Sequence, residues 1–265
     1  MRVSRRTMVG AITRGTTNPN RLRRCDRWLA QTQRWRLYDT SDPVVVDLGF
    51  GASPVTTVEL RDRLRKAHDR VSVVGVEIDP ARVAVAAPMA GEGLEFRVGG
   101  FEVPLPGDSR AAVIRAFNVL RQYAEDDVPQ AWEMLCARLT PRGLLIDGTC
   151  DEIGRRATWV AVTRQGPQSL TLSMNFGAFD RPSDVADRLP KSLIHRNVPG
   201  ERIHTYLQAL DAAWAHQAPL ASYGRRQRMV ATAHQMRAAG WPLADGPRRW
   251  RLGELTVRWD AVCPA

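Results

Sequence analysis

The segment 44–54 limits the possible folds of this chain more than any other stretch. Its first three residues are valines, which predict a strand buried on both faces, as in a parallel sheet. Gly49 and Gly51 follow at once, where the chain must turn sharply and bare backbone can approach a ligand closely. Ser53 and Pro54 are residue types preferred at the cap and at the first position of a helix. The segment therefore predicts the strand, loop and helix of an α/β protein.

Strand-like and helix-like segments alternate through the first half of the chain. The apolar runs are separated by helix-length spacers, a pattern typical of right-handed parallel βαβ units. The expected strands are 44–48, 71–78, 95–98, 111–117 and 144–146, and the expected helices are 54–68, a short one from 80, and 129–139.

An acidic residue ends the second expected strand. Glu77 lies 26 positions after Gly51 and closes an almost entirely apolar run. In parallel sheets this end of a strand lies at the ligand-binding edge, where a carboxylate can accept hydrogen bonds from the hydroxyls of a ribose. The alternative is an acidic residue in a surface turn. We favour the ribose interpretation.

These residues resemble motif I and the ribose-binding acid of class I S-adenosylmethionine (SAM)-dependent methyltransferases. Asp47, Gly49 and Gly51 match motif I, and Ser53 stands where the family often has a third glycine. The missing third glycine also makes the loop a poor dinucleotide fingerprint.

The resemblance covers residues 44–148 well and 225–259 loosely. It implies an α/β fold with a Rossmann-like, mostly parallel seven-stranded sheet, an antiparallel last strand, helices on both faces, and an inserted cap with a hairpin and helices. It also implies SAM as the cofactor. The residues implied to bind SAM are Asp47, Gly49, Phe50, Gly51, Glu77, Ile78, Gly100, Phe101, Glu102 and Asn118.

The family holds adenine after its third strand, which corresponds here to the segment 99–102. The family usually has an acidic residue at the Gly100 position, so this chain departs from the pattern. Phe101 is expected to pack on the purine, and Glu102 or backbone groups to bind its amine. Asn118, after the fourth strand, belongs to the segment that lies beside the methionine part of the cofactor.

The patterns along the chain, taken together with the resemblance of 44–148 and 225–259, predict how the chain is divided. We expect a basic N-terminal lid helix in 1–40, a SAM-binding core in 41–150, and a helix with strands that complete the sheet in 223–265. Between them, 151–222 is interpreted as an inserted substrate-binding cap. Its first part predicts a β-hairpin around the turn 165–168, because the preceding strand is too close for a helical crossover.

Methyl transfer from a sulfonium is an in-line displacement, which needs mainly alignment of the reactants and exclusion of water. A strong base is optional, and no catalytic residue is assigned. His195, Arg196 and His204 are candidates to contact a polar or anionic acceptor; the alternative is that they only connect cap and core. We expect the acceptor atom to be an oxygen or nitrogen of a small molecule or an RNA.

The net charge of +10 is concentrated at the two ends of the chain. Residues 1–40 carry ten arginines against two aspartates, and 221–265 carry eight arginines against three acids. Such ends would attract a polyanion such as RNA or DNA. Alternatively, the arginine content reflects only the base composition of the genome.

The four cysteines are scattered, without metal-ligand or redox spacing, so we expect reduced thiols, no metal and a cytoplasmic protein. No apolar run reaches membrane-spanning length, and the one that follows the paired arginines of 4–8 is too short for a secretory signal. Two other functions stay open. One is a catalytically inactive, methyltransferase-like nucleic-acid-binding protein, and the other is an NAD(P)-dependent oxidoreductase.

Overall fold

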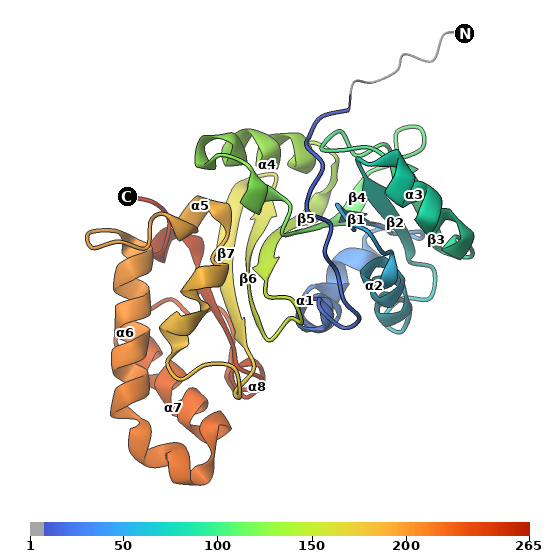
Figure 1. Cartoon of the computed structure of the whole chain (residues 1–265). Coiled ribbons are helices and arrows are strands. Elements are labelled where there is room, and N and C mark those ends of the chain that lie inside the picture. The colour runs from blue at the N-terminus through green and yellow to red at the C-terminus, as the bar shows by residue number, and fades with distance from the viewer. Residues whose placement is uncertain (1–7) are drawn as a thin grey trace, which may run out of the picture.

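A single mixed sheet forms the centre of the molecule in the computed structural model, which describes residues 8–265 (Figure 1). The paired arginines near the start of the chain therefore lie outside the described residues. Of the 4–8 segment, only Met8 is described. The sheet has eight strands in the order β3-β2-β1-β4-β5-β6-β7-β8. The strands are β1 Val44–Leu48, β2 Ser72–Glu77, β3 Leu94–Val98, β4 Ala111–Phe117, β5 Leu139–Cys150, β6 Arg156–Thr163, β7 Gly166–Met174 and β8 Glu254–Arg258.

The first five strands are parallel and form the Rossmann-like half of the sheet. β1 pairs with β2 on one side and with β4 on the other, so the strand order reverses between β1 and β4. In open α/β sheets, ligands bind outside the carboxyl ends of the strands at such a reversal. The predicted α/β fold with parallel strands and an antiparallel last strand is confirmed, since β8 is antiparallel to β7.

The other half of the sheet differs from the prediction in two respects. The sheet has eight strands instead of seven, and the expected hairpin, β6 and β7, belongs to the sheet rather than to a cap. The cause is the short connection between β5 and β6. Asp151 accepts hydrogen bonds there from the backbone of Ile153, Arg155 and Arg156, which turns the chain back beside β5.

Helices cover both faces of the sheet. The main ones are α1 Arg23–Trp28, α2 Val55–Arg65, α3 Pro80–Ala86, α4 Val128–Cys136, α5 Lys191–Ile194, α6 Arg202–His216, α7 Arg225–Ala238 and α8 Pro247–Trp250. The helix expected within 1–40 is short, and the chain continues after it as a π-helical turn, Leu29–Gln33, and a 3-10 turn, Arg34–Tyr38. Of the strands expected in 223–265, β8 forms, and the residues before it make only one bridge, between Leu243 and Val257.

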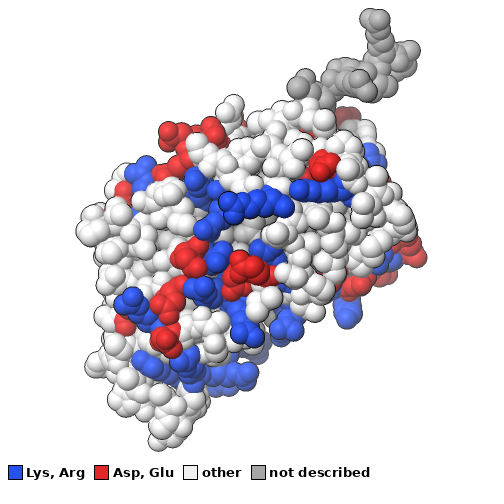
Figure 2. Space-filling view, in the orientation of Figure 1, with Lys and Arg blue, Asp and Glu red and all other residues white. Residues whose placement is uncertain are grey.

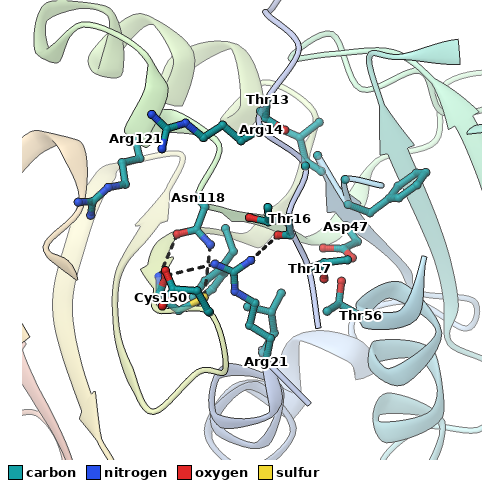
Figure 3. A pocket seen from close by; sticks show the side chains of 18 of the residues that line it. Thr13, Arg14, Thr16, Thr17, Arg21, Asp47, Thr56, Asn118, Arg121 and Cys150 are labelled. Carbon is teal, nitrogen blue, oxygen red and sulfur yellow. Dashed lines mark hydrogen bonds between the residues drawn. The ribbon is translucent and has the colours of Figure 1, made fainter. Parts of the chain in front are cut away.

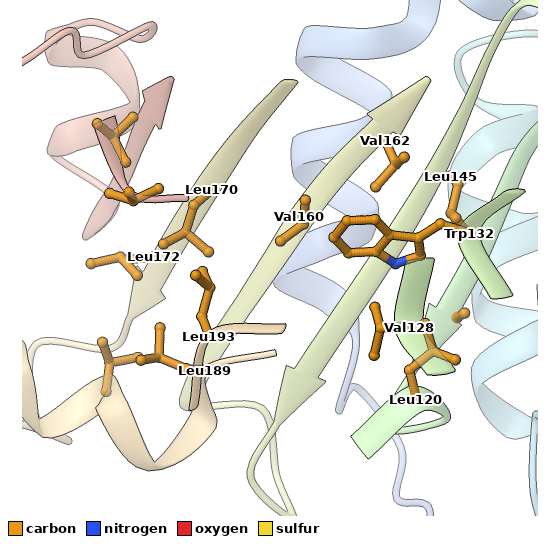
Figure 4. Close-up of a cluster of buried hydrophobic side chains, with 14 of the residues drawn as sticks. Leu120, Val128, Trp132, Leu145, Val160, Val162, Leu170, Leu172, Leu189 and Leu193 are labelled. Carbon is orange, nitrogen blue, oxygen red and sulfur yellow. The ribbon is translucent and has the colours of Figure 1, made fainter. Parts of the chain in front are cut away.

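Alternate residues of the strands point to opposite faces and feed two apolar cores. Val45 and Val73 lie in the core beneath α1 and α2. Val46 and Val74 lie in the other core, which extends under α4, α6 and α7. Figure 4 shows part of that second core, where Trp132 of α4 faces Val160 and Val162 of β6. No helix within residues 8–265 is both long and apolar enough to span a membrane.

One carboxyl group is buried beneath α4. Asp147 of β5 is 2% exposed and accepts a 3.0 Å hydrogen bond from the Trp132 indole N–H. Burial raises the pKa of Asp147 to about 7, and the bond from Trp132 lowers it only in part. Asp147 is therefore protonated in the folded protein under mildly acidic conditions.

We predict that Asp147→Asn stabilises the protein above pH 7 but not near pH 4. Between about pH 4, the ordinary carboxyl pKa, and about pH 7, the folded state holds a proton that the unfolded state releases. The free energy of unfolding therefore falls as pH rises through this window and is lowest above it. Asparagine does not ionise, so the variant does not lose this part of the free energy of unfolding, which is up to about 4 kcal/mol.

Urea unfolding of wild type and variant at intervals from pH 4 to pH 8 measures the effect. Other buried acids, such as Glu254, titrate in both proteins and cancel in the difference. A stability difference that is the same at every pH would contradict the prediction.

Candidate functional site

A cavity of about 630 Å³ lies at the carboxyl ends of β1, β4 and β5, where the strand order reverses (Figure 3). Its walls come from the glycine loop after β1, from the segment after β4, and from the chain before α1. The lining residues include Thr13, Arg14, Thr16, Thr17, Arg21, Asp47, Gly49, Gly51, Thr56, Asn118, Arg121, Cys150 and Arg188. The sequence prediction of a ligand-binding loop at 49–51 thus coincides with a cavity.

The two glycines of the loop adopt backbone conformations that other residues rarely take. Gly49 has φ of 70° and Gly51 has φ of 83°. The Gly49 N–H donates to the carbonyl of Val76, which ties the loop to the end of β2. A Cβ atom at Gly51 would lie 2.6 Å from the carbonyl oxygen of Gly15. Positive φ and close approach of backbone together explain why glycine is required here.

Glu77 lies at the bottom of the loop, buried and 1% exposed. One carboxylate oxygen accepts a 2.9 Å hydrogen bond from the Gly51 N–H. The other accepts bonds from the N–H groups of Ile78 and Asp79, and Arg82 lies 3.6 Å from it. A carboxylate has about four acceptor positions, so one position next to the loop is left for a ligand.

Asp47 lines the cavity, but its carboxylate is held by other residues of the protein. It accepts hydrogen bonds from Thr57 and from the guanidinium of Arg115, which is fully buried in β4. Arg115 also pairs with the buried Asp26 of α1, and Arg63 of α2 completes the group. Burial alone would lower the pKa of Arg115, but the two aspartates outweigh that effect and raise it above its usual value. This buried ion group thus holds α1, α2, β1 and β4 together.

The segment after β3 presents a backbone N–H donor, that of Phe101, next to the carboxylate of Glu102. Glu102 accepts a hydrogen bond from the Gly100 N–H, and the other oxygen of its carboxylate accepts one from Val9. The Phe101 N–H donates to the carbonyl of Val9 at 2.8 Å. The Phe101 ring is buried and packs on Tyr123, with ring centroids 5.1 Å apart.

An extended segment before α1, residues 8–17, crosses this edge of the sheet, and we call it the strap. Besides the Val9 contacts, the Ala11 N–H donates to the Tyr123 hydroxyl and the Ala52 N–H donates to the Gly15 carbonyl. Arg82 donates to the Thr13 carbonyl. Between the strap, Glu77 and the 99–101 segment only about 20 Å³ of space remains. The strap therefore fills the place where the sequence predicts the nucleoside.

The helix expected as a lid packs elsewhere. α1 lies against α2, and its Trp28 ring meets Trp159 of β6 at 5.5 Å between centroids. The segment over the site is the extended strap. The division of the chain into lid, core and cap stays a prediction.

Asn118 connects the ends of β4 and β5. It has a positive φ of 59°, and its side-chain oxygen accepts a hydrogen bond from the Cys150 N–H. Its amide also lies 3.3 Å from the Cys150 sulfur. Burial raises the pKa of the Cys150 thiol, and Arg21 lowers it only in part. This thiol is therefore protonated near neutral pH and is a poor nucleophile.

The three residues predicted to contact an acceptor lie in the described structure but do not line the cavity. Arg196 pairs with Glu125 and Glu201. His204 contacts Asn197, and His195 lies next to Lys191. These contacts join neighbouring segments, and an acceptor function of the three residues stays a prediction.

The structure brings the predicted cofactor residues together around one edge of the sheet. Gly49, Phe50, Gly51, Asn118 and Asp47 line the large cavity, and Glu77, Ile78, Gly100 and Phe101 line the small space under the strap. Sequence reasoning missed Arg115 and the strap. The position of Arg115 within an otherwise apolar strand could have indicated a buried ion pair. The strap has no distinctive sequence pattern that could have predicted its path. The described residues contain no group of three or more His, Cys, Asp or Glu that could hold a metal.

Comparison with known proteins yields partial structural similarity. No family model and no curated protein matches the chain. It is similar to the plantazolicin methyltransferase BamL in complex with a triazolic desmethylPZN analog and SAH, with 13% identity, coverage of 49% of this chain and 46% of that chain, and a TM-score of 0.38. It is similar to LepI in complex with SAM, with 14% identity, 45% and 30% coverage, and a TM-score of 0.38.

A third similar structure is the mitomycin 7-O-methyltransferase MmcR, with 20% identity, 47% and 36% coverage, and a TM-score of 0.32. The chain spans less than half the length of each of these proteins. The assignment of the fold therefore depends on the strand order observed in this chain.

We predict that Arg115→Met lowers the free energy of unfolding by about 3–5 kcal/mol, because Asp26 and Asp47 would remain buried without their main counter-charge. The matched control is Arg97→Ala. Arg97 pairs with Glu95 on the surface, and losing that pair costs at most about 1 kcal/mol. Urea unfolding at pH 7 measures both, and equal losses would contradict the prediction.

Proposed function

We propose that this protein binds SAM at the carboxyl edge of its parallel strands and transfers the methyl group to an oxygen or nitrogen atom of an acceptor. The observation that carries the proposal is the set of ligand groups at the ends of β2 and β3. These are the buried Glu77 carboxylate, the Phe101 N–H and the Glu102 carboxylate.

The chemistry of these groups suits an adenosine. The edge of adenine carries an amino group that donates and a ring nitrogen that accepts. Glu102 and the Phe101 N–H offer the complementary acceptor and donor, and the Phe101 ring is available for apolar contact with the purine. Glu77 has an acceptor position left for a ribose hydroxyl. The glycine loop leaves backbone rather than side chains beside that sugar.

The strap must leave the nucleoside position before SAM can bind. The peptide group of Val9 makes the same pair of hydrogen bonds that an adenine edge would make, to Glu102 and to the Phe101 N–H. The two spaces on either side of the strap share Thr13, Leu48 and Gly49 in their walls. Displacement of the strap would join them into one elongated site.

SAM, when bound, supplies a methyl group already activated by the positive sulfonium. The residues of the chain then have to orient it and exclude water. Asn118 and the glycine loop would hold the methionine end, and the protonated Cys150 makes a covalent thiolate mechanism unsuitable. The acceptor would enter the large cavity, whose walls include Arg121 and Arg188. Arg188 comes from the 151–222 segment, which agrees with its proposed substrate-binding function.

We predict that wild-type protein binds SAM and that Glu77→Gln weakens this binding about 10- to 100-fold, since a hydrogen bond to a charged acceptor contributes about 1.5–3 kcal/mol. Titration calorimetry with SAM and with SAH measures both affinities. The matched control is Glu95→Gln, a half-exposed acid on β3 with a surface partner, which should leave binding unchanged.

No detectable binding by wild type or by strap variants would contradict the proposed function. Melting temperatures in the presence of NADH and of SAM distinguish the oxidoreductase alternative. A radiolabelled methyl-transfer screen over RNA, protein, lipid and small-molecule fractions tests catalysis. Binding without transfer to any fraction would favour the inactive, binding-protein alternative.

We predict that loosening the strap strengthens SAM binding. Val9→Pro removes the N–H that donates to Glu102, and Gly15→Val places a side chain where even a Cβ would lie 2.6 Å from the Arg82 guanidinium. Each change should tighten SAM binding about fivefold, as expected for loss of about 1 kcal/mol of competing contact.

Ile12→Ala is the matched control, because this side chain is 62% exposed and lies in the same strap. Trypsin cleavage after the exposed Arg14 gives a second measurement, and it should become faster when SAH is added. Weaker SAM binding by both strap variants would mean that the strap holds the cofactor instead of competing with it.

A further inference from the structure

A second cavity, of about 550 Å³, lies away from the candidate cofactor site and shares no lining residue with it. Four separate segments form its walls: α1, the residues after β7, the start of α7 with the turn before it, and the turn between α8 and β8. Its most conspicuous members are six arginines, namely Arg23, Arg24, Arg27, Arg225, Arg226 and Arg251.

The fold places the two basic ends of the chain side by side at this cavity. α8 lies between α7 and α1 in the lower half of the view in Figure 1. Basic side chains also gather along the lower edge of the face drawn in Figure 2. The sequence has its positive charge in 1–40 and 221–265, and the tertiary structure gathers part of both into one concave surface, which we call the arginine pocket.

Most arginines of the protein have acidic or carbonyl partners, but several in the arginine pocket have none. The side chains of Arg23, Arg27, Arg226 and Arg251 are exposed and form no hydrogen bond or ion pair with any other residue of the described 8–265 range. An arginine content set only by genome composition would not explain this concentration of unpaired charge. The guanidinium groups are therefore free to bind an external anion.

The acids near the pocket do not neutralise it. Glu254 is buried and bonded to Arg249. Asp180, fully exposed, lies 3.6 Å from Arg225, which also donates to two backbone carbonyls. Burial lowers the pKa of Arg24. Glu254 opposes this effect, and the neighbours Arg23 and Arg27 lower the pKa further. Like charges held this close repel one another, and a bound polyanion would relieve that repulsion.

An aromatic side chain adds a second type of contact. Tyr223, in the 3-10 turn Ala218–Tyr223, lines the pocket and is 75% exposed. The Phe176 ring lies in the same wall. Arginines that bind phosphates, together with an exposed ring on which a base can stack, are the combination used by proteins that bind single-stranded nucleic acid.

We propose that the arginine pocket binds the phosphate backbone of a single-stranded nucleic acid, with a base stacked on Tyr223. Guanidinium groups bind phosphate oxygens in a bidentate manner, and several around one concavity can hold successive phosphates. The inference does not depend on SAM binding, because the two cavities are separate.

Fluorescence anisotropy with a labelled 12-nucleotide single-stranded RNA, measured over a series of salt concentrations, tests the proposal. The double variant Arg23→Glu/Arg226→Glu should bind at least tenfold more weakly. The slope of log affinity against log salt should become shallower by about 1.4, since each phosphate contact contributes about 0.7 for single strands. Neither residue has an internal partner, so folding should be unaffected.

The matched control is Arg70→Glu/Arg164→Glu, which changes the net charge by the same amount at exposed positions outside the pocket. It should change the affinity less than twofold. Equal losses in both double variants, or no RNA binding by wild type, would overturn the proposal.

Tyr223→Ala separates nucleic acid from small polyphosphates. It should weaken RNA binding about tenfold, because stacking of one base contributes about 1–3 kcal/mol, but leave the affinity for inorganic tripolyphosphate unchanged. RNA binding that is unaffected by Tyr223→Ala and is abolished by tripolyphosphate would overturn the nucleic-acid assignment.

Discussion

The buried Arg115 guanidinium holds the N-terminal half of the structure together. It lies inside β4 with no exposed surface and binds Asp26 of α1 and Asp47 of β1. Removing charges from water is costly, and only good geometry with complete hydrogen bonding offsets that cost. The group therefore fixes how α1 fits on the sheet, and with it where the strap leaves α1 to cross the carboxyl edge.

That constraint limits how Asp47 can act at the glycine loop. Asp47 belongs to the buried ion group, so its effect on a ligand is exerted through the position of the glycine loop. Glu77 and the segment 100–102 border the position proposed for the nucleoside. The strap forms hydrogen bonds there with the Glu102 carboxylate and the Phe101 N–H. Under the proposed function, the strap and SAM would therefore compete for these two groups.

The parallel strands and the glycine loop were predictable because their signals are local. Apolar runs of strand length, the glycines at 49 and 51, and the acid at 77 each depend on neighbouring residues only. The hairpin of β6 and β7 was also predictable as a hairpin. Its place in the sheet was not, because that depends on the turn held by Asp151 and on pairing with β5 and β8.

The amino-acid sequence by itself determined the α/β class and the residues gathered at the carboxyl edge of the parallel strands, where the ligand is proposed to bind. Three features were decided only by the tertiary structure: the pairing of Arg115 with two distant aspartates, the path of the strap, and the meeting of both basic ends in the arginine pocket. The physical reason is sequence separation. Periodicity and turn chemistry act over a few residues, whereas these contacts join segments that only the folded sheet brings together.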